Sequence, residues 1–185
     1  MYELIKWSPE LDLSDFYRLA TARGFENNSS QKVLVDAFKN EDDSCVWILY
    51  YNQVPVGSTA CHSLNIFEKK SYRICARTCV FTDLLPLQHL RSRGYTIQRH
   101  QNATAQFFIP KCIEWAPDDA DLYISTNSSE VASQDQVHRI YCPALVETGA
   151  LEKTTELSYR GHLQTFWKLN REVFLNQLNE LPRWH

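Results

Sequence analysis

Hydrophobic and polar residues in the N-terminal part of the chain are spaced as in one strand followed by two helices. Tyr2–Trp7 alternates weakly and predicts a short strand. Between Leu11 and Ala22 the apolar residues recur at helical spacing, and the same spacing returns over Val33–Phe38. The acidic stretch Asn40–Asp43 follows the second of these segments. We therefore expect the chain to begin as strand, helix, helix.

The pattern then changes to that of strands. Val46–Tyr51 is rich in aromatic and β-branched residues, Asn52-Gln53 is a turn signal, and Pro55–Leu64 follows as a partner strand. After a polar turn, Tyr72–Phe81 alternates with a period of two. These segments predict an antiparallel meander.

Arg73 and Arg77 lie on one face of the strand predicted at Tyr72–Phe81, because residues two apart share a face. We expect this face to be the solvent side of an antiparallel sheet. The other interpretation is that both arginines extend a basic region toward Arg91–Thr96.

Helices and strands alternate in the second half of the chain. Pro110 falls within a long helical pattern and predicts a kink or break, because proline removes an amide donor and crowds the preceding turn. Pro143 presents the same difficulty in a later helix. The expected elements are a helix over Thr96–Ala116, a strand over Asp121–Thr126, a helix from Ser129 or Ser133 to Gly149, strands over Leu151–Tyr159 and Leu163–Leu169, and a helix over Arg171–Glu180.

This order predicts an α/β (α+β) fold with a mixed, mostly antiparallel central sheet flanked by helices. The length of 185 residues suits one domain over residues 1–185, with residues 170–185 as a helical extension. A hydrophobic content of 44% is enough for a packed core.

Charge and segment composition narrow the function classes. A net charge of −3 argues against a protein that binds nucleic acid or an acidic membrane over a broad basic surface. The N-terminus has no basic region followed by an apolar core, and no apolar run approaches the roughly 20 residues that span a bilayer. We therefore expect a cytoplasmic protein that uses neither a membrane nor nucleic acid.

The six cysteines lie inside hydrophobic segments and show no CxxC spacing. Reduced, buried thiols are expected in preference to disulfides or a metal site. The histidines show no HxxxH or HxH spacing, so no metal ligand set is predicted.

Local positive charge gathers in the segment LRSRGYTIQR, Leu90–Arg99, in front of the predicted helix. The first amides of a helix lack internal acceptors, and the helix dipole adds partial positive charge there. Gly94 permits a close approach of the backbone, and Arg91 and Arg93 can clamp phosphate oxygens. This loop is the candidate anion site, although a solvated turn is the other interpretation.

The loop resembles the pyrophosphate-binding motif R/Q-x-x-G-x-G/A of GNAT-type N-acetyltransferases. Arg91, Gly94 and Thr96 fall on its three marked positions, and Thr96 stands where the family has Gly or Ala. The order of predicted elements over about Met1–Leu169 is also similar to that of the family. The resemblance implies a GNAT-like sheet of about seven strands in which strands four and five splay apart.

The same resemblance implies that the chain transfers an acetyl or other acyl group from acetyl-CoA to an amine of a small molecule or peptide by direct attack. Backbone groups on the fourth strand would hold the pantetheine arm, and an asparagine after the fifth strand would hydrogen-bond the cofactor. The implied cofactor-binding residues are Cys79, Val80, Phe81, Arg91, Ser92, Arg93, Gly94, Tyr95, Thr96 and Asn127.

The catalytic acid and base are less directly indicated. Many family members carry a tyrosine four residues before the glycine that ends the fourth helix, but here that position is Leu145. Tyr141, one helical turn earlier, is the candidate acid, and Asp83 or Glu147 the candidate base. The alternative is that each of these side chains has only a structural role in the core or at the surface. A chain of water molecules could then serve as the base.

Two other functions are compatible with the sequence. One is a non-catalytic module of the same fold that binds CoA or another ligand. The other is a nucleic-acid-binding protein that uses the arginines at positions 73, 77, 91, 93 and 99, which the net acidity disfavours. Exposed aromatic residues at the chain end make a homodimer the expected assembly if the chain associates.

Overall fold

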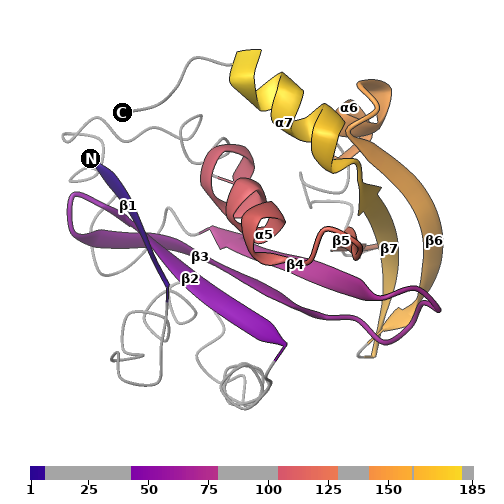
Figure 1. Cartoon of the computed structure of the whole chain (residues 1–185). Helices are drawn as coiled ribbons and strands as arrows, with labels where there is room; N and C mark the ends of the chain where they lie inside the picture. The colour runs from indigo at the N-terminus through magenta and orange to yellow at the C-terminus, as the bar shows by residue number, and fades with distance from the viewer. Residues whose placement is uncertain (7–42, 79–103, 129–141, 160, 181–185) are drawn as a thin grey trace. The chain divides into compact units, whose positions relative to one another are not determined.

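The computed structural model describes residues 1–6, 43–78, 104–128, 142–159 and 161–180. The chain divides into two compact units, and the expectation of a single domain over residues 1–185 stays a prediction. The elements, labelled as in Figure 1, are β1 (Tyr2–Lys6), β2 (Ser44–Tyr51), β3 (Val54–Ser63), β4 (Ser71–Thr78), the π-helix η1 (Thr104–Phe108), α5 (Ile109–Trp115), β5 (Asp121–Asn127), α6 (Cys142–Glu147), β6 (Leu151–Tyr159), β7 (His162–Leu169) and α7 (Arg171–Glu180).

The strands form one seven-stranded sheet in the order β1-β2-β3-β4-β5-β7-β6. The pairs β1·β2, β2·β3, β5·β7 and β6·β7 are antiparallel, and β4 pairs with β5 in parallel. This confirms the predicted mixed, mostly antiparallel sheet with flanking helices. The helices expected between Leu11 and Phe38 lie outside the described residues.

The first unit contains the β2–β3 hairpin, whose turn agrees with the sequence. Asn52 and Gln53 both have positive φ, 48° and 68°, as the favoured two-residue hairpin turns require. A register shift follows at Leu49/Tyr50, where Tyr50 faces Pro55. Proline has no amide to donate to the ladder, and it is tolerated in a strand at an irregularity of this kind.

A change of helix type occurs at the position where Pro110 predicted a break. The π-helix ends at Phe108, and α5 begins at Ile109, directly before Pro110. Pro110 therefore sits in the first turn of α5, where a missing amide donor costs little. Phe108, Ile109 and Cys112, which belong to the first unit, are buried.

The second unit is built around β5, β7 and β6, together with the first residues of β4. Gly161 has a φ of +81° at the β6–β7 turn, a backbone region that favours glycine. On the face that carries Ile74, Tyr72 contacts Trp115 edge to face, with ring centroids 5.4 Å apart. Trp167 Nε1 donates to Thr126 Oγ1 at 2.8 Å, so the buried indole is satisfied.

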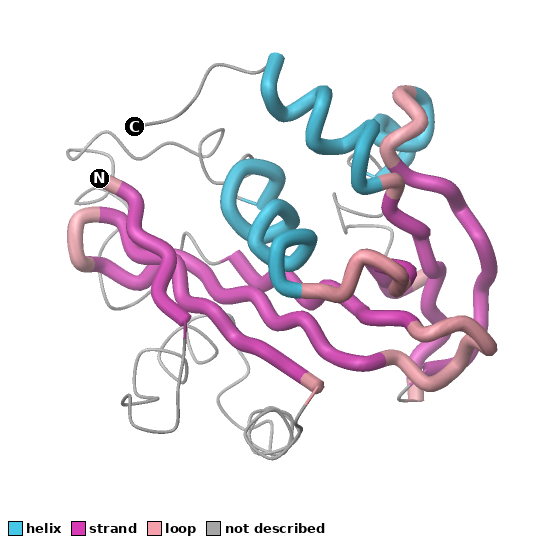
Figure 2. The backbone as a smooth tube through the Cα atoms, in the orientation of Figure 1, coloured by secondary structure: helices cyan, strands magenta, loops and turns pink. Residues whose placement is uncertain are grey.

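Two helix ends in this unit match the expected boundaries. After α6, Gly149 has a φ of +78°, and Ala150 N donates to Leu145 O at 2.9 Å. Asn170 caps α7 because its Oδ1 accepts from Val173 N at 3.2 Å. Figure 2 shows α7 leaving directly from the end of β7. These local contacts therefore mark the end of α6 and the start of α7.

Four cysteines, Cys45, Cys61, Cys112 and Cys142, are buried free thiols, which confirms the expectation for them. Burial raises the pKa of the Cys45 thiol above its ordinary value. The side chains of the other two cysteines lie outside the described part. No described helix has the length and apolar character of a membrane span.

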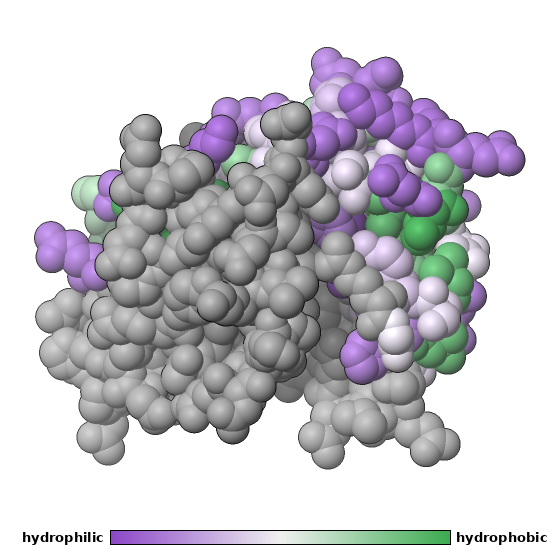
Figure 3. Space-filling view, turned by 90° about the horizontal axis from the view of Figure 1, so that it is seen from below, coloured by the Kyte–Doolittle hydropathy of each residue, from purple (hydrophilic) through white to green (hydrophobic). Residues whose placement is uncertain are grey.

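The terminal strand β6 carries mostly hydrophilic exposed side chains. Glu152, Lys153, Thr154, Glu156 and Ser158 are all exposed. In Figure 3 the coloured, described residues likewise mix hydrophilic and hydrophobic side chains on the visible face. Charged residues on a terminal strand discourage pairing with another sheet edge.

Candidate functional site

Most of the residues predicted to bind the cofactor or catalyse the reaction lie outside the described part of the chain. This applies to Cys79–Phe81, Asp83, Arg91–Thr96 and Tyr141. Their assignments therefore stay predictions. Asn127 is described as the last residue of β5, where its Cα is opposite Gln164.

The parallel β4·β5 pair relates these predicted residues to the sheet. Its ladder runs from Ser71↔Asp121 to Ile74↔Ile124. Because both strands run in the same direction, the segment after β4 and the end of β5 leave the ladder at the same end. Along the chain, the predicted cofactor residues Cys79–Phe81 follow β4 and Asn127 ends β5, and their role stays a prediction.

A buried polar cluster occupies one face of β4, β5 and β7. Arg73 is 8% exposed, and its Nε donates to Ser125 Oγ at 2.6 Å. Its Nη2 donates to Gln164 Oε1 at 3.3 Å. The guanidinium carbon lies 5.3 Å from the centroid of the Tyr159 ring. We call Arg73, Ser125, Gln164 and Tyr159 the Arg73 cluster.

Hydrogen bonds within the Arg73 cluster also orient its neutral members. Ser125 Oγ donates to Gln164 Oε1 at 2.6 Å, and Gln164 Nε2 donates to the Tyr159 carbonyl at 3.3 Å. The amide oxygen of Gln164 thus accepts from both Ser125 and Arg73, and its nitrogen is held by the β6–β7 hairpin. The three polar side chains form a preorganised arrangement.

The expectation that Arg73 lies on a solvent-facing surface is wrong. An apolar group packs on the same face of the sheet, where Leu64, Tyr123 and Phe166 are buried and Phe67, Leu157 and Tyr159 pack against them. The parallel neighbour β5, which the β2–β3–β4 meander did not reveal, places Ser125 beside the arginine. The side chain of Arg77 lies outside the described part.

Sequence reasoning did not single out Ser125, Tyr159 or Gln164 for any role. The only available signal was the period of two along each strand, which puts Gln164 and Phe166 on one face of β7. That signal cannot identify the strand whose side chains lie opposite. These side chains meet only because β4, β5 and β7 are neighbours in the sheet.

A second group of charges surrounds Asp121 at the start of β5. Its carboxylate accepts from Lys69 Nζ at 2.7 Å and lies 2.9 Å from Lys168 Nζ. Burial alone would raise the pKa of Asp121, but the hydrogen bonds from the two lysines outweigh it, and the pKa is lowered. The bond to Asp121 raises the pKa of Lys168.

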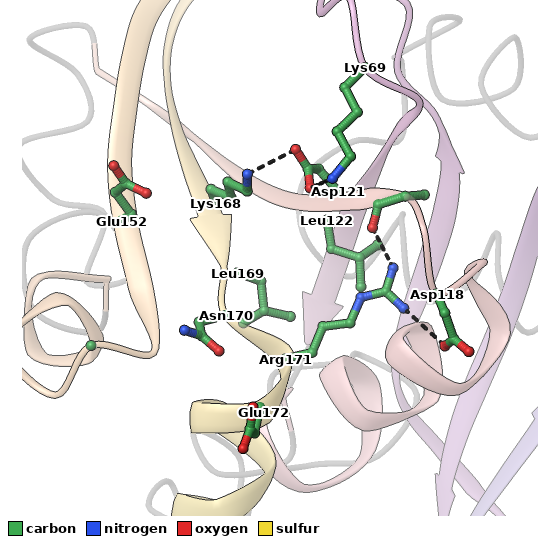
Figure 4. A pocket seen from close by; sticks show the side chains of 12 residues that line it. Lys69, Asp118, Asp121, Leu122, Glu152, Lys168, Leu169, Asn170, Arg171 and Glu172 are labelled. Atoms are coloured by element: carbon green, nitrogen blue, oxygen red, sulfur yellow. Dashed lines mark hydrogen bonds and ion pairs between the residues drawn. The ribbon is translucent and has the colours of Figure 1, made fainter.

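These residues line a hollow of about 420 Å³, shown in Figure 4. Arg171, the first residue of α7, also lines it and donates to the carbonyls of Pro117 and Ala120 at 2.7 and 2.6 Å. Its guanidinium lies 3.8 Å from the exposed Asp118. Each of the described cations around the hollow, Lys69, Lys168 and Arg171, thus contacts an acceptor of the protein itself. We therefore assign these charged residues a role in stability.

We expect Asp121→Asn to lower the free energy of unfolding at neutral pH by about 1–2 kcal/mol, because two charge-assisted contacts are lost. Because the pKa of Asp121 is lower in the folded than in the unfolded state, its carboxylate stabilises the fold at pH values above its ordinary pKa. That stability is lost as the pH falls through the pKa of the folded state. The difference between wild type and variant should therefore shrink below pH 3.8, the ordinary value. Urea unfolding at several pH values measures it.

Asp118→Asn is the matched control, because the Asp118 side chain is fully exposed. It should unfold like the wild type at every pH. An Asp121→Asn variant as stable as the wild type at neutral pH would contradict the role given to the lysine contacts.

Sequence comparison assigns no family, since no protein-family model matches the chain. No curated protein matches it either. Structure comparison does find similar folds. An uncharacterized protein from Bacillus halodurans has a TM-score of 0.65 at 11% identity, over 97% of this chain and 89% of that one.

Two further similar structures are acetyltransferases by name. An aminoglycoside N(6')acetyltransferase from Legionella pneumophila has a TM-score of 0.55 at 13% identity, with 95% of each chain covered. An acetyltransferase of the GNAT family from Streptococcus pneumoniae has a TM-score of 0.52 at 9% identity, over 91% of this chain and 97% of that one. At such identities the likeness establishes the fold and nothing finer.

Proposed function

We propose that this chain, which has the fold of the GNAT family of N-acetyltransferases, is an acyl-CoA-dependent N-acyltransferase. The observation that carries the proposal is the parallel β4·β5 ladder within an otherwise antiparallel sheet. In the chain β4 precedes the Arg91–Thr96 motif, and β5 ends at Asn127. The likeness in fold covers nearly the whole chain, which supports the same interpretation.

The proposed reaction is direct acyl transfer. The lone pair of a neutral amine attacks the thioester carbon, a C–N bond forms, and the C–S bond breaks. The amine loses one proton and the leaving thiolate gains one, so the products are an amide and free CoA. No covalent enzyme intermediate is needed.

Roles for individual residues follow the family resemblance. Main-chain groups of Cys79–Phe81 hold the pantetheine arm and supply an oxyanion donor. The Arg91–Thr96 segment binds the diphosphate through amides and guanidinium groups. Tyr141 is the proposed acid, and Asp83 the proposed base.

The second candidate function is a module that binds acyl-CoA without turnover. The observation that favours it is Leu145, which lies within α6 and carries no transferable proton. It occupies the position at which many enzymes of the family have a tyrosine. The two candidates share the ligand and differ in whether thiol is released.

Two measurements test the proposal. Acetyl-CoA should raise the melting temperature, because a ligand that binds only the folded state stabilises it, by about 2.7 kcal/mol at one hundred times its dissociation constant. Incubation with a panel of amines should then release free thiol. A shift without thiol release selects the binding module, and no shift at millimolar acetyl-CoA overturns both candidates.

A further inference from the structure

We propose that the Arg73 cluster binds a carboxylate group of a small-molecule ligand, which under the proposed function is the amine acceptor. That the ligand is the acceptor rests on the proposed function. The carboxylate site itself rests only on the contacts of Arg73.

The first support is a buried charge that no described residue compensates. Arg73 is more than nine-tenths buried, yet both hydrogen bonds that it makes to described residues go to neutral oxygens, those of Ser125 and Gln164. Among the described residues no carboxylate pairs with it. A buried cation without a counterion is costly, and an anion from a ligand would remove that cost.

The second support is donor capacity that the described residues leave unused. A guanidinium has five N–H donors, and the contacts of Arg73 involve Nε and Nη2. Its Nη1 makes no hydrogen bond within the described part of the chain. As far as the described residues go, the Nη1 and Nη2 edge can therefore receive the two oxygens of a carboxylate as a planar, bidentate pair.

The third support is rigidity. Ser125 holds Nε, Gln164 holds Nη2, and the Tyr159 ring covers one face of the guanidinium. A side chain held on three sides loses little further conformational entropy when a ligand binds. Contacts from β5, β6 and β7 thus prepare Arg73 for recognition.

A carboxylate fits this cluster better than a phosphate does. The cluster contains one cation, which balances one negative charge. The other described cations on this face of the sheet, Lys69 and Lys168, are paired with Asp121. A doubly charged phosphate would keep uncompensated charge next to a buried aromatic group.

The test compares acids with their amides, using the full chain at constant ionic strength. The pairs are glycine and glycinamide, β-alanine and β-alaninamide, and γ-aminobutyrate and its amide. Each pair keeps the amine and the skeleton and changes only the carboxylate, and the three lengths sample the unknown distance to the reacting amine. At least one acid should raise the melting temperature, and its amide should not.

Two variants locate the effect. Arg73→Gln removes the cation and should abolish the response to the acid. Gln164→Glu keeps the side-chain shape and places a carboxylate next to Arg73, so it should weaken acid binding by about tenfold or more. If Arg73→Gln fails to fold, Gln164→Glu decides the matter. Lys153→Gln, which removes an exposed charge on β6, should respond like the wild type.

The inference is overturned if no acid stabilises the protein more than its amide does. It is also overturned if Gln164→Glu, or a folded Arg73→Gln, responds like the wild type. Acetyl-CoA shifts measured alongside separate it from the proposed function. A wild type that responds to acetyl-CoA and to no acid keeps that function, whereas one that responds only to acids keeps the carboxylate site.

Discussion

Replacing Phe166 with alanine is expected to lower the free energy of unfolding by about 3–5 kcal/mol, the usual cost of removing a buried phenyl ring from a core. Phe166 is fully buried. Its ring meets Phe67 and Tyr159 edge to face, at centroid distances of 5.9 and 5.7 Å, and lies 6.5 Å from Tyr123. The truncation removes these contacts and leaves a cavity. Urea unfolding gives the difference directly.

Two variants bracket this effect. Phe166→Leu keeps much of the volume and should cost clearly less than the alanine variant. Leu163→Ala on the same strand removes a side chain that is 44% exposed, and it should change stability little. An alanine variant at Phe166 that costs less than about 1 kcal/mol would show that this aromatic group is not a structural core.

Gly94→Glu is expected to abolish the stabilisation of the chain by acetyl-CoA. The motif requires a close approach of the backbone to the diphosphate, and a glutamate side chain blocks it and adds negative charge beside the phosphates. The wild-type shift, equivalent to about 2.7 kcal/mol at one hundred times the dissociation constant, should fall to the level of noise. Melting curves with and without acetyl-CoA measure it.

Ser158→Glu is the control for Gly94→Glu, because it adds the same charge at an exposed position of β6. It should keep the full response to acetyl-CoA. The unliganded melting temperatures of both variants show whether either substitution disturbs folding. A Gly94→Glu variant that responds like the wild type would remove the Arg91–Thr96 loop from the proposed site.

Local chemistry in the sequence predicted several features of the fold correctly. Asn52-Gln53 marked the hairpin turn because both residues tolerate positive φ there better than a β-branched residue would. Pro110 marked the change from π-helix to α-helix because proline has no amide N–H to donate to the preceding turn. Gly149 marked the end of α6 because glycine readily adopts the positive φ that is found there.

The candidate site was only partly predictable. The motif at Arg91–Thr96 is a short contiguous pattern, so the sequence can propose it without knowledge of the fold. The Arg73 cluster joins residues from β4, β5, β6 and β7, and no contiguous pattern contains it. The sequence of β4 alone predicted that Arg73 faces solvent. Alternating side chains define the two faces of a strand, but they do not show which segment covers either face.

In the part of the chain that the structure describes, the sequence by itself determined where strands, turns and two helix ends fall, and which residues share a strand face. These properties depend on backbone preferences and on periods of a few residues, which are present in any short window. Only the tertiary structure decided that β5 lies parallel to β4, that β7 follows it in the sheet, and that Arg73 is buried against Ser125 and Gln164. Strand order and burial depend on contacts between segments far apart in the chain, and the free energy of those contacts is not encoded in any one segment.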